Sequence, residues 1–217
     1  MKTKTMIMAL ISCLSINAAP AWGNSVDVGY ASDHFRRGAL TAEESVQAGA
    51  SFGFKALGLD SSVGVFTNQS VASGGTDFYL VDVGASKQIG ELLSLYGGLQ
   101  HAELVAGDAT LEVNLQVGLE TALNPSLSVY RNTDDALYTY EASVSHSFDL
   151  DVADLGLSAS YGNTDVSSST DVEYYTVGAS LSRSISDSAS VSAGLDYVDS
   201  DVIDNESIFS LGLSINF

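Results

Sequence analysis

The sequence predicts an all-β protein, a transmembrane barrel of antiparallel, up-and-down strands, and three features indicate this fold class. Apolar residues alternate with small or polar residues from residue 26 to residue 217. Short turns alternate along the chain with longer polar segments. The final segment has an apolar residue at every second position and closes on Phe217. About twelve strands account for this pattern, and ten are possible if a weak one is misread.

Residues 1–23 have the organisation of a secretory signal peptide. Lys2 and Lys4 precede an apolar run at 6–16, and small residues follow at 18–21. The run is too short for a membrane-spanning helix, which needs about 20 residues. We expect cleavage after Ala21 or Gly23. No linker divides the remainder, so residues 24–217 are expected to form a single barrel domain.

Composition narrows the classes of function. The chain has 8 Lys+Arg and 27 Asp+Glu, a formal net charge of −19, which argues against nucleic acid as a partner. Such acidity suits either a salty habitat or a function that favours cations. The one cysteine, Cys13, falls in the signal peptide, so we expect no disulfide and no thiolate site in the mature chain.

The strand pattern is clearest at residues 111–120, where one face is aliphatic and the other carries two carboxylates, two amides and a glycine. Apolar and polar residues also alternate in the strands of a water-soluble β-sandwich, so the character of the polar face must decide where the apolar face points. Because that face is small or polar in other segments too, we expect lipid outside and a polar interior. The predicted strands are 26–32, 46–55, 59–67, 78–87, 92–101, 111–120, 126–132, 137–148, 155–162, 173–185, 189–198 and 207–217.

An even number of strands puts both chain ends in the periplasm. The short turns then lie on the periplasmic side, at 56–58, 88–91, 123–125, 149–154 and 186–188. The longer segments are expected to be outer loops, none of them long enough for a substantial plug: 33–45, 68–77, 102–110, 133–136, 163–171 and 199–206.

The carboxyl-terminal strand carries a delivery signal. Its alternating apolar residues resemble the pattern read by the outer-membrane barrel insertion machinery: Phe209, Leu211, Leu213, Ile215 and Phe217. We therefore expect the outer membrane of a Gram-negative bacterium as the location. The expected partners are that insertion machinery, outer-membrane lipid and lipopolysaccharide.

Residues 30–38, Tyr-Ala-Ser-Asp-His-Phe-Arg-Arg-Gly, resemble the Y-x-S-D-Y-x-F-R-G signature of a family of uncharacterised proteobacterial outer-membrane β-barrel proteins. The match departs at His34, where the family has an aromatic residue, and covers a short part of the chain. The resemblance implies location more than chemistry, because the family has no established activity to carry over.

The inward face supplies the main functional hypothesis. Strand parity places six acidic residues inside, with Lys55 as the clear basic counterpart: Asp27, Asp82, Glu112, Glu120, Glu141 and Asp196. Such a wall attracts cations and repels anions. We therefore predict a small, non-enzymatic, porin-like channel that prefers cations, through which small cationic or neutral solutes diffuse passively. The alternative is that these carboxylates hydrogen-bond Ser, Tyr and Asn across a closed interior.

Two other classes of function stay open. A closed structural or adhesive surface barrel, such as a phage receptor, would use the acidic outer segments at Asp165, Asp171, Asp199, Asp201, Asp204 and Glu206. These residues lack the spacing of a calcium loop, so no metal site or cofactor is expected. An outer-membrane lipid hydrolase, which we favour least, would need His34 or His101. Ser32, Asp33 and His34 form no triad, because adjacent strand residues point to opposite faces.

Three arginines are candidates for contact with lipopolysaccharide. Arg36 and Arg37 lie at the outer end of the first strand, and Arg131 has outward parity near the headgroups. Guanidinium groups bind phosphate through paired hydrogen bonds. His146 is expected to face lipid near the periplasmic interface, in an aromatic girdle.

Overall fold

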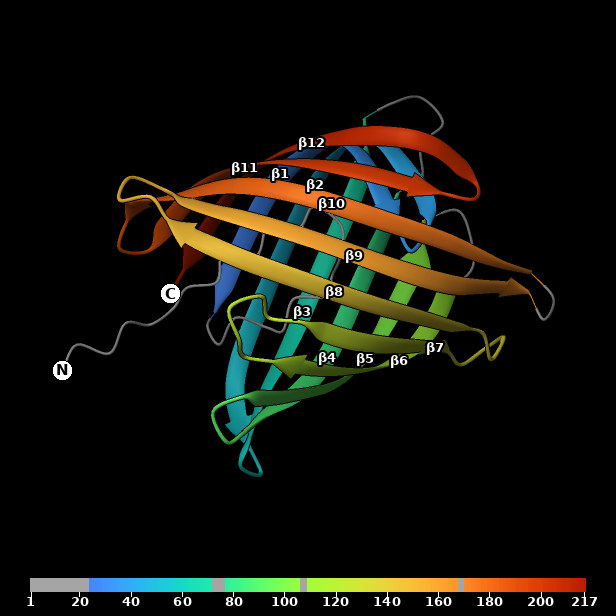
Figure 1. The fold of residues 1–217 in the computed structure, drawn as a ribbon, viewed down its shortest axis with the longest axis horizontal. Coiled ribbons are helices and arrows are strands. Elements are labelled where there is room, and N and C mark those ends of the chain that lie inside the picture. Colours follow the sequence, from blue (N-terminus) through green and yellow to red (C-terminus); the bar gives the residue numbers. More distant parts are fainter. Residues whose placement is uncertain (1–23, 72–76, 106–108, 168–169) are drawn as a thin grey trace.

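Twelve strands and no helix make up a single closed barrel (Figure 1) in a computed structural model of the chain, which describes residues 24–71, 77–105, 109–167 and 170–217. The strands are β1 (Ser25–Arg36), β2 (Ala39–Ala56), β3 (Leu59–Ser70), β4 (Phe78–Ile89), β5 (Leu93–Leu104), β6 (Ala109–Leu119), β7 (Ser126–Asn132), β8 (Tyr138–Asp149), β9 (Asp154–Ser167), β10 (Thr170–Ser186), β11 (Ala189–Ser200) and β12 (Ile203–Asn216). The predicted fold class and number of strands are confirmed. The predicted signal peptide lies outside the described residues.

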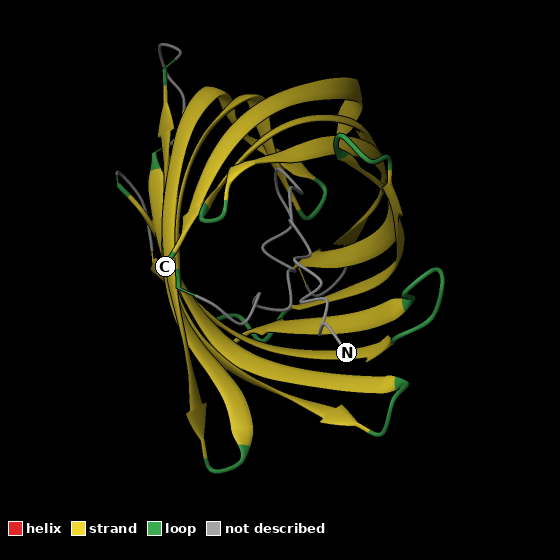
Figure 2. Ribbon diagram, turned by 90° about the vertical axis from the view of Figure 1, so that its left-hand side faces the viewer, coloured by secondary structure: helices red, strands yellow, loops and turns green. Residues whose placement is uncertain are grey.

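Every strand pairs antiparallel with its neighbours in sequence, and β1 closes the ring against β12. Figure 2 shows the strands arranged around the lumen. The closing register runs from Ser25 opposite Asn216 to Ala31 opposite Ser210. The backbone N–H of Phe217 donates to the carbonyl of Asn24 at 3.0 Å. Residue 24 and the carboxyl terminus therefore lie side by side at one end of the barrel.

The barrel is inside out relative to a soluble protein. Outward side chains are large and apolar yet exposed, for example Leu115 (61%) and Leu127 (65%). Inward ones are small or polar and buried, for example Asn68 and Ser210. A closed barrel satisfies every strand edge, so an apolar exterior suits it to lipid. The chain is therefore an outer-membrane β-barrel. Among the described residues, no helix is long and apolar enough to cross a bilayer.

Aromatic residues border the apolar band at both ends, as in other transmembrane barrels. At the end of the barrel that holds the carboxyl terminus, the border of the apolar band consists of phenylalanines: Phe52, Phe54, Phe148 and Phe217. Its opposite border is rich in tyrosine: Tyr30, Tyr79, Tyr140, Tyr161, Tyr175 and Tyr197. All of these side chains are more than one third exposed on the outward face, so the membrane-spanning height lies between the two borders.

The predicted periplasmic turns are short, as expected. Between β2 and β3, for instance, Leu57 and Gly58 both have positive φ (55° and 75°), which matches the twist of a two-residue hairpin turn. All the outer segments except the one between β7 and β8 are shorter than predicted, because the strands continue into them. β11 and β12 are separated only by residues 201–202, where a loop at 199–206 was expected. Outside the apolar band both faces of a strand are polar, so alternation disappears while backbone pairing continues.

The expected loop at 33–45 is the largest error. β1 continues to Arg36, β2 begins at Ala39, and the turn between them has φ values of 50° and 89° at Arg37 and Gly38. The pairing of β1 with β12 ends at Ala31, and that of β2 with β3 begins at Ser45. Residues 32–44 therefore form a hairpin that pairs with itself and leaves the barrel wall. We call this segment the inner hairpin.

Candidate functional site: the lumen and the inner hairpin

One side of the inner hairpin packs on the wall formed by β10 to β12. The ring of Phe35 is 3% exposed and clusters with Tyr174, Val198 and Ile208. The ring centroids of Phe35 and Tyr174 lie 5.8 Å apart in an edge-to-face arrangement. These partners point into the barrel, so Phe35 anchors the hairpin inside the lumen through burial of apolar area.

The other side of the hairpin reaches β3 and β4. His34 is 1% exposed, and its ring centroid lies 4.9 Å from that of Phe78 and 6.2 Å from that of Phe66. Its Nδ1 is 3.2 Å from Nε2 of Gln47. His34 is therefore buried against the aromatic wall of the lumen.

The tip of the hairpin fits closely against β10 and β11. The hydroxyl of Ser200 donates to the carbonyl of Gly38 at 2.7 Å. A Cβ added to Gly38 would lie 2.8 Å from Cγ1 of Val172 and 3.2 Å from the ring of Tyr174. Glycine is needed here for its positive φ and also for this close approach.

Arg36 and Arg37 bind a carboxylate in the lumen. Nη2 of Arg36 donates to Oε2 of Glu112 at 2.8 Å and to Oε1 of Gln100 at 2.7 Å. Nη1 of Arg37 donates to Oε1 of the same Glu112, and its guanidinium carbon lies 4.1 Å from the ring centroid of Tyr130. The side chains are only 22% (Arg36), 17% (Arg37) and 10% (Glu112) exposed.

This cluster corrects two expectations. Arg36 and Arg37 were expected to contact lipopolysaccharide, but they point into the lumen, where Glu112 neutralises part of their charge. No outer segment was expected to plug the barrel, yet the inner hairpin contacts β3–β4, β5–β7 and β10–β12 and so crosses the lumen. In Figure 1 it is the blue ribbon behind β10 to β12 near the right-hand end.

Other predicted lumen carboxylates line the wall. Asp82 on β4 and Asp196 on β11 face inward. Each lies across a glycine of the adjacent strand: a Cβ added to Gly64 would clash with Asp82, and one added to Gly178 would clash with Asp196. The carboxylates therefore lie flat on the wall. In the described part of the chain, no lysine or arginine is within ion-pair distance of either.

Glu141 and Asp27 are two more of the predicted inward carboxylates that lie on strands. Glu141 accepts a hydrogen bond from the hydroxyl of Tyr174 at 3.0 Å, next to the ring contact with Phe35. Asp27 lies near the periplasmic end and accepts a hydrogen bond from Ser25 at 3.0 Å.

Two predicted lumen residues lie at the periplasmic mouth. Lys55 forms an ion pair with Asp60 at 3.2 Å, and its side chain is 85% exposed. Glu120 follows the last residue of β6 and is exposed in the turn. Lys55 has the predicted inward parity, whereas Glu120 lies beyond the end of its strand, and both side chains are exposed to solvent.

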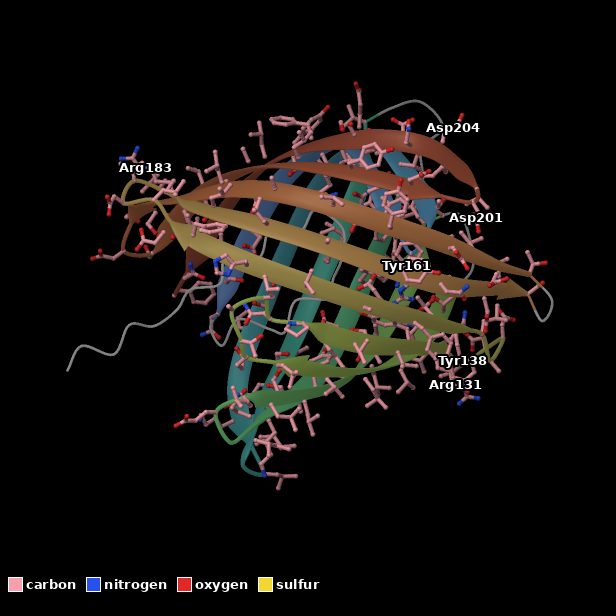
Figure 3. The ribbon with its side chains drawn as sticks, viewed as in Figure 1. Arg131, Tyr138, Tyr161, Arg183, Asp201 and Asp204 are labelled. Carbon is pink, nitrogen blue, oxygen red and sulfur yellow. The ribbon has the colours of Figure 1, made fainter. Side chains whose placement is uncertain are left out.

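The outer surface carries the remaining candidates (Figure 3). Arg131 projects outward beside Tyr138, 5.9 Å from its ring centroid, which agrees with its predicted side of the wall. Asp201 and Asp204 lie at the far end of the barrel from Arg183. Among the described residues, no group of three or more His, Cys, Asp or Glu side chains is arranged to hold a metal ion.

The histidines are not brought together. His34 is inside the lumen, whereas His101 is on the outward face, with Nε2 3.7 Å from Glu103. His146 stacks edge-on against Phe148 at 4.4 Å on the outer surface near the phenylalanine border. The barrel wall thus separates the two histidines that a lipid hydrolase was expected to use.

The predicted lumen residues did not include Gln100, Tyr130 and Tyr174, which contact the hairpin. Each occupies an inward position of its own strand, so parity within these strands could have included them. Their partners could not be foreseen, because these contacts depend on where the hairpin turns inward.

Known barrels share this architecture. The KdgM porin superposes with a TM-score of 0.63 at 14% identity, covering 89% of this chain and 99% of that one. A second structure of it is described as a complex with disordered oligogalacturonate. An outer membrane channel from Pseudomonas putida F1 gives 0.62 at 10% identity, covering 92% and 97%. LpxR from Salmonella typhimurium gives 0.55 at 11% identity, covering 89% and 100%.

At these identities the likeness shows the fold alone. No family model matches the sequence, and no curated protein matches it either.

Proposed function

We propose that the protein is a porin-like channel through which small solutes diffuse passively across the outer membrane, with a preference for cations. The observation that carries the proposal is the polar inward face of a closed barrel. Asp27, Asp82, Glu141 and Asp196 face the lumen from four different strands. Carboxylates that line a water-filled lumen with walls of low dielectric attract cations and repel anions.

The first test measures current through the purified full chain in planar bilayers under a gradient of KCl. We expect discrete conductance steps and a reversal potential displaced toward that of potassium. Absence of conductance at verified insertion, or a preference for chloride, would contradict the proposal.

The acidic wall is tested by the double variant D82N/D196N. These carboxylates lack an ion-pair partner in the described residues, so removing both charges should lower the potassium-to-chloride permeability ratio several-fold. The matched control is E91Q/D187N, which removes two charges from exposed periplasmic turns. An equal change in both double variants would mean that net charge, and not the lumen wall, sets the preference.

The solute class is tested by swelling of liposomes that contain the protein. The acidic lumen should admit small cations and neutral sugars faster than acidic sugars of similar size. Because the KdgM porin has been seen with oligogalacturonate, that polyanion belongs in the panel. Faster passage of the polyanion would contradict the expected charge preference.

One observation favours a second candidate, a closed barrel with a structural or adhesive role. The inner hairpin crosses the lumen and contacts three sectors of the wall. In that case the acidic outer hairpins would be the working surface. Liposomes containing the protein would then swell no faster than empty ones, and attachment of cells or phage would depend on residues 199–206.

A further inference from the structure

The inner hairpin brings two positive charges close to one negative charge on the wall of the lumen. Two guanidinium groups, from Arg36 and Arg37, converge on the single carboxylate of Glu112, and each binds a different oxygen of it. Gln100, which also binds Arg36, is neutral, and so is Tyr130 beneath Arg37. The three charged side chains together carry about one net positive charge.

The position of this cluster exposes passing solutes to its field. The hairpin reaches opposite sectors of the wall, through His34 at β3–β4 and Phe35 at β10–β12. Arg36 and Arg37 contact a third sector of the wall, at β5–β7. A solute that crosses the barrel must pass this level, where water screens charges less than in bulk.

Glu112 lowers the free-energy cost of placing the two arginines in the lumen. Partly buried guanidinium groups are costly unless they are paired and hydrogen-bonded, and Glu112 supplies both the charge and two acceptor oxygens. Its effect on selectivity therefore differs from that of Asp82 or Asp196. Glu112 mainly cancels positive charge brought by the hairpin.

We infer that Arg36, Arg37 and Glu112 form the charge filter of the channel, and that Glu112 reduces the positive charge with which the two hairpin arginines oppose the cation preference of the acidic wall. The inference rests on the proposed channel function. The filter has two parts of opposite charge, the arginines of the inner hairpin and the carboxylate of Glu112 on the wall. Removing the arginines and removing the carboxylate must therefore shift the potassium-to-chloride selectivity in opposite directions.

Reversal potentials of the full chain under a KCl gradient test this filter. E112Q leaves two uncompensated guanidinium groups, and we expect the potassium-to-chloride permeability ratio to fall about tenfold, which corresponds to about 1.4 kcal/mol. R36Q/R37Q leaves the carboxylate alone and should raise the ratio. R36Q/R37Q/E112Q should return it close to that of the parent.

The matched control is E120Q, which removes one carboxylate from the exposed turn that follows the same strand. It should leave the reversal potential unchanged. Circular dichroism and resistance to unfolding in detergent are measured on each variant, and the triple variant retains the apolar anchor at Phe35, so a loss of folding is separable from a change of filter.

Two outcomes are decisive. A conducting parent whose reversal potential is the same in E112Q, E120Q and R36Q/R37Q would overturn the filter and leave the channel function standing. A parent that inserts but does not conduct would overturn both. Opposite shifts in E112Q and R36Q/R37Q would support the filter.

Discussion

Asp196 and Gly178 illustrate how single residues shape the lumen. The carboxylate lies against Cα of a glycine on the neighbouring strand, and Ser158 approaches the same position from the other side. A side chain at 178 would occupy the space that the carboxylate fills. The absence of a Cβ thus decides whether the charge lies flat on the wall or projects into the path of solutes.

Gly178→Ala should therefore change the channel without unfolding it. A Cβ would clash with Asp196, so the carboxylate must rotate into the lumen, at an overpacking cost of roughly 1–3 kcal/mol. We expect an altered single-channel conductance in planar bilayers. The control is Gly49→Ala, whose Cβ would lie 3.5 Å from its nearest neighbour, in ordinary contact. Identical conductance in the two variants would contradict the proposed packing.

At the scale of elements, the inner hairpin is the part of the barrel that departs from a simple up-and-down meander. β1 and β2 belong to the wall up to Ala31 and from Ser45, and between these points their strand ladder is with each other. Apolar anchoring by Phe35, stacking of His34 and the ion pairs of Arg36 and Arg37 hold the hairpin against different sectors of the wall. The hairpin is thus docked independently of the ladder that closes the barrel.

Phe35→Ala should loosen the hairpin while the barrel persists. Truncating a buried phenylalanine costs about 3–5 kcal/mol, and this loss falls on docking of the hairpin. Amide hydrogen exchange within residues 32–44 should become faster, with little change in β5 to β9. Val28→Ala, on the outward face of the same strand, is the control. Unchanged exchange in the hairpin would show that Phe35 does not anchor it.

At the scale of the whole molecule, the barrel is defined by the opposite character of its two faces. Leu115 and Gln116 are adjacent on β6, yet one is exposed on the apolar exterior and the other faces the lumen. The same substitution at the two positions therefore places the new side chain either in lipid or in the polar lumen.

Leu115→Arg should destabilise the barrel by about 2–4 kcal/mol, the cost of a lipid-facing arginine near the middle of the bilayer. Gln116→Arg should leave stability nearly unchanged and instead lower the preference for cations. Reversible unfolding by guanidinium chloride in lipid bilayers gives the first quantity, and reversal potential gives the second. Equal destabilisation of both variants would contradict the assigned faces.

Much of the fold could be predicted from the sequence because period two is a local property of a strand. The twelve strands and the outward faces of their apolar segments follow from alternation within each segment, as at residues 111–119. The position of Asp82, Asp196 and Glu141 inside the barrel follows from the same parity. Alternation does not predict a strand where both faces are polar, as at 199–206, since a strand beyond the membrane carries no alternation.

A barrel with an apolar exterior and an acidic interior follows from the sequence alone, because each strand contains its own pattern. The path of residues 32–44 depends instead on the tertiary structure. Gly38 meets Ser200, 162 residues away, and Arg36 meets Glu112, 76 residues away. Such contacts exist only once the ring has closed, since closure brings the opposite walls within reach of one hairpin.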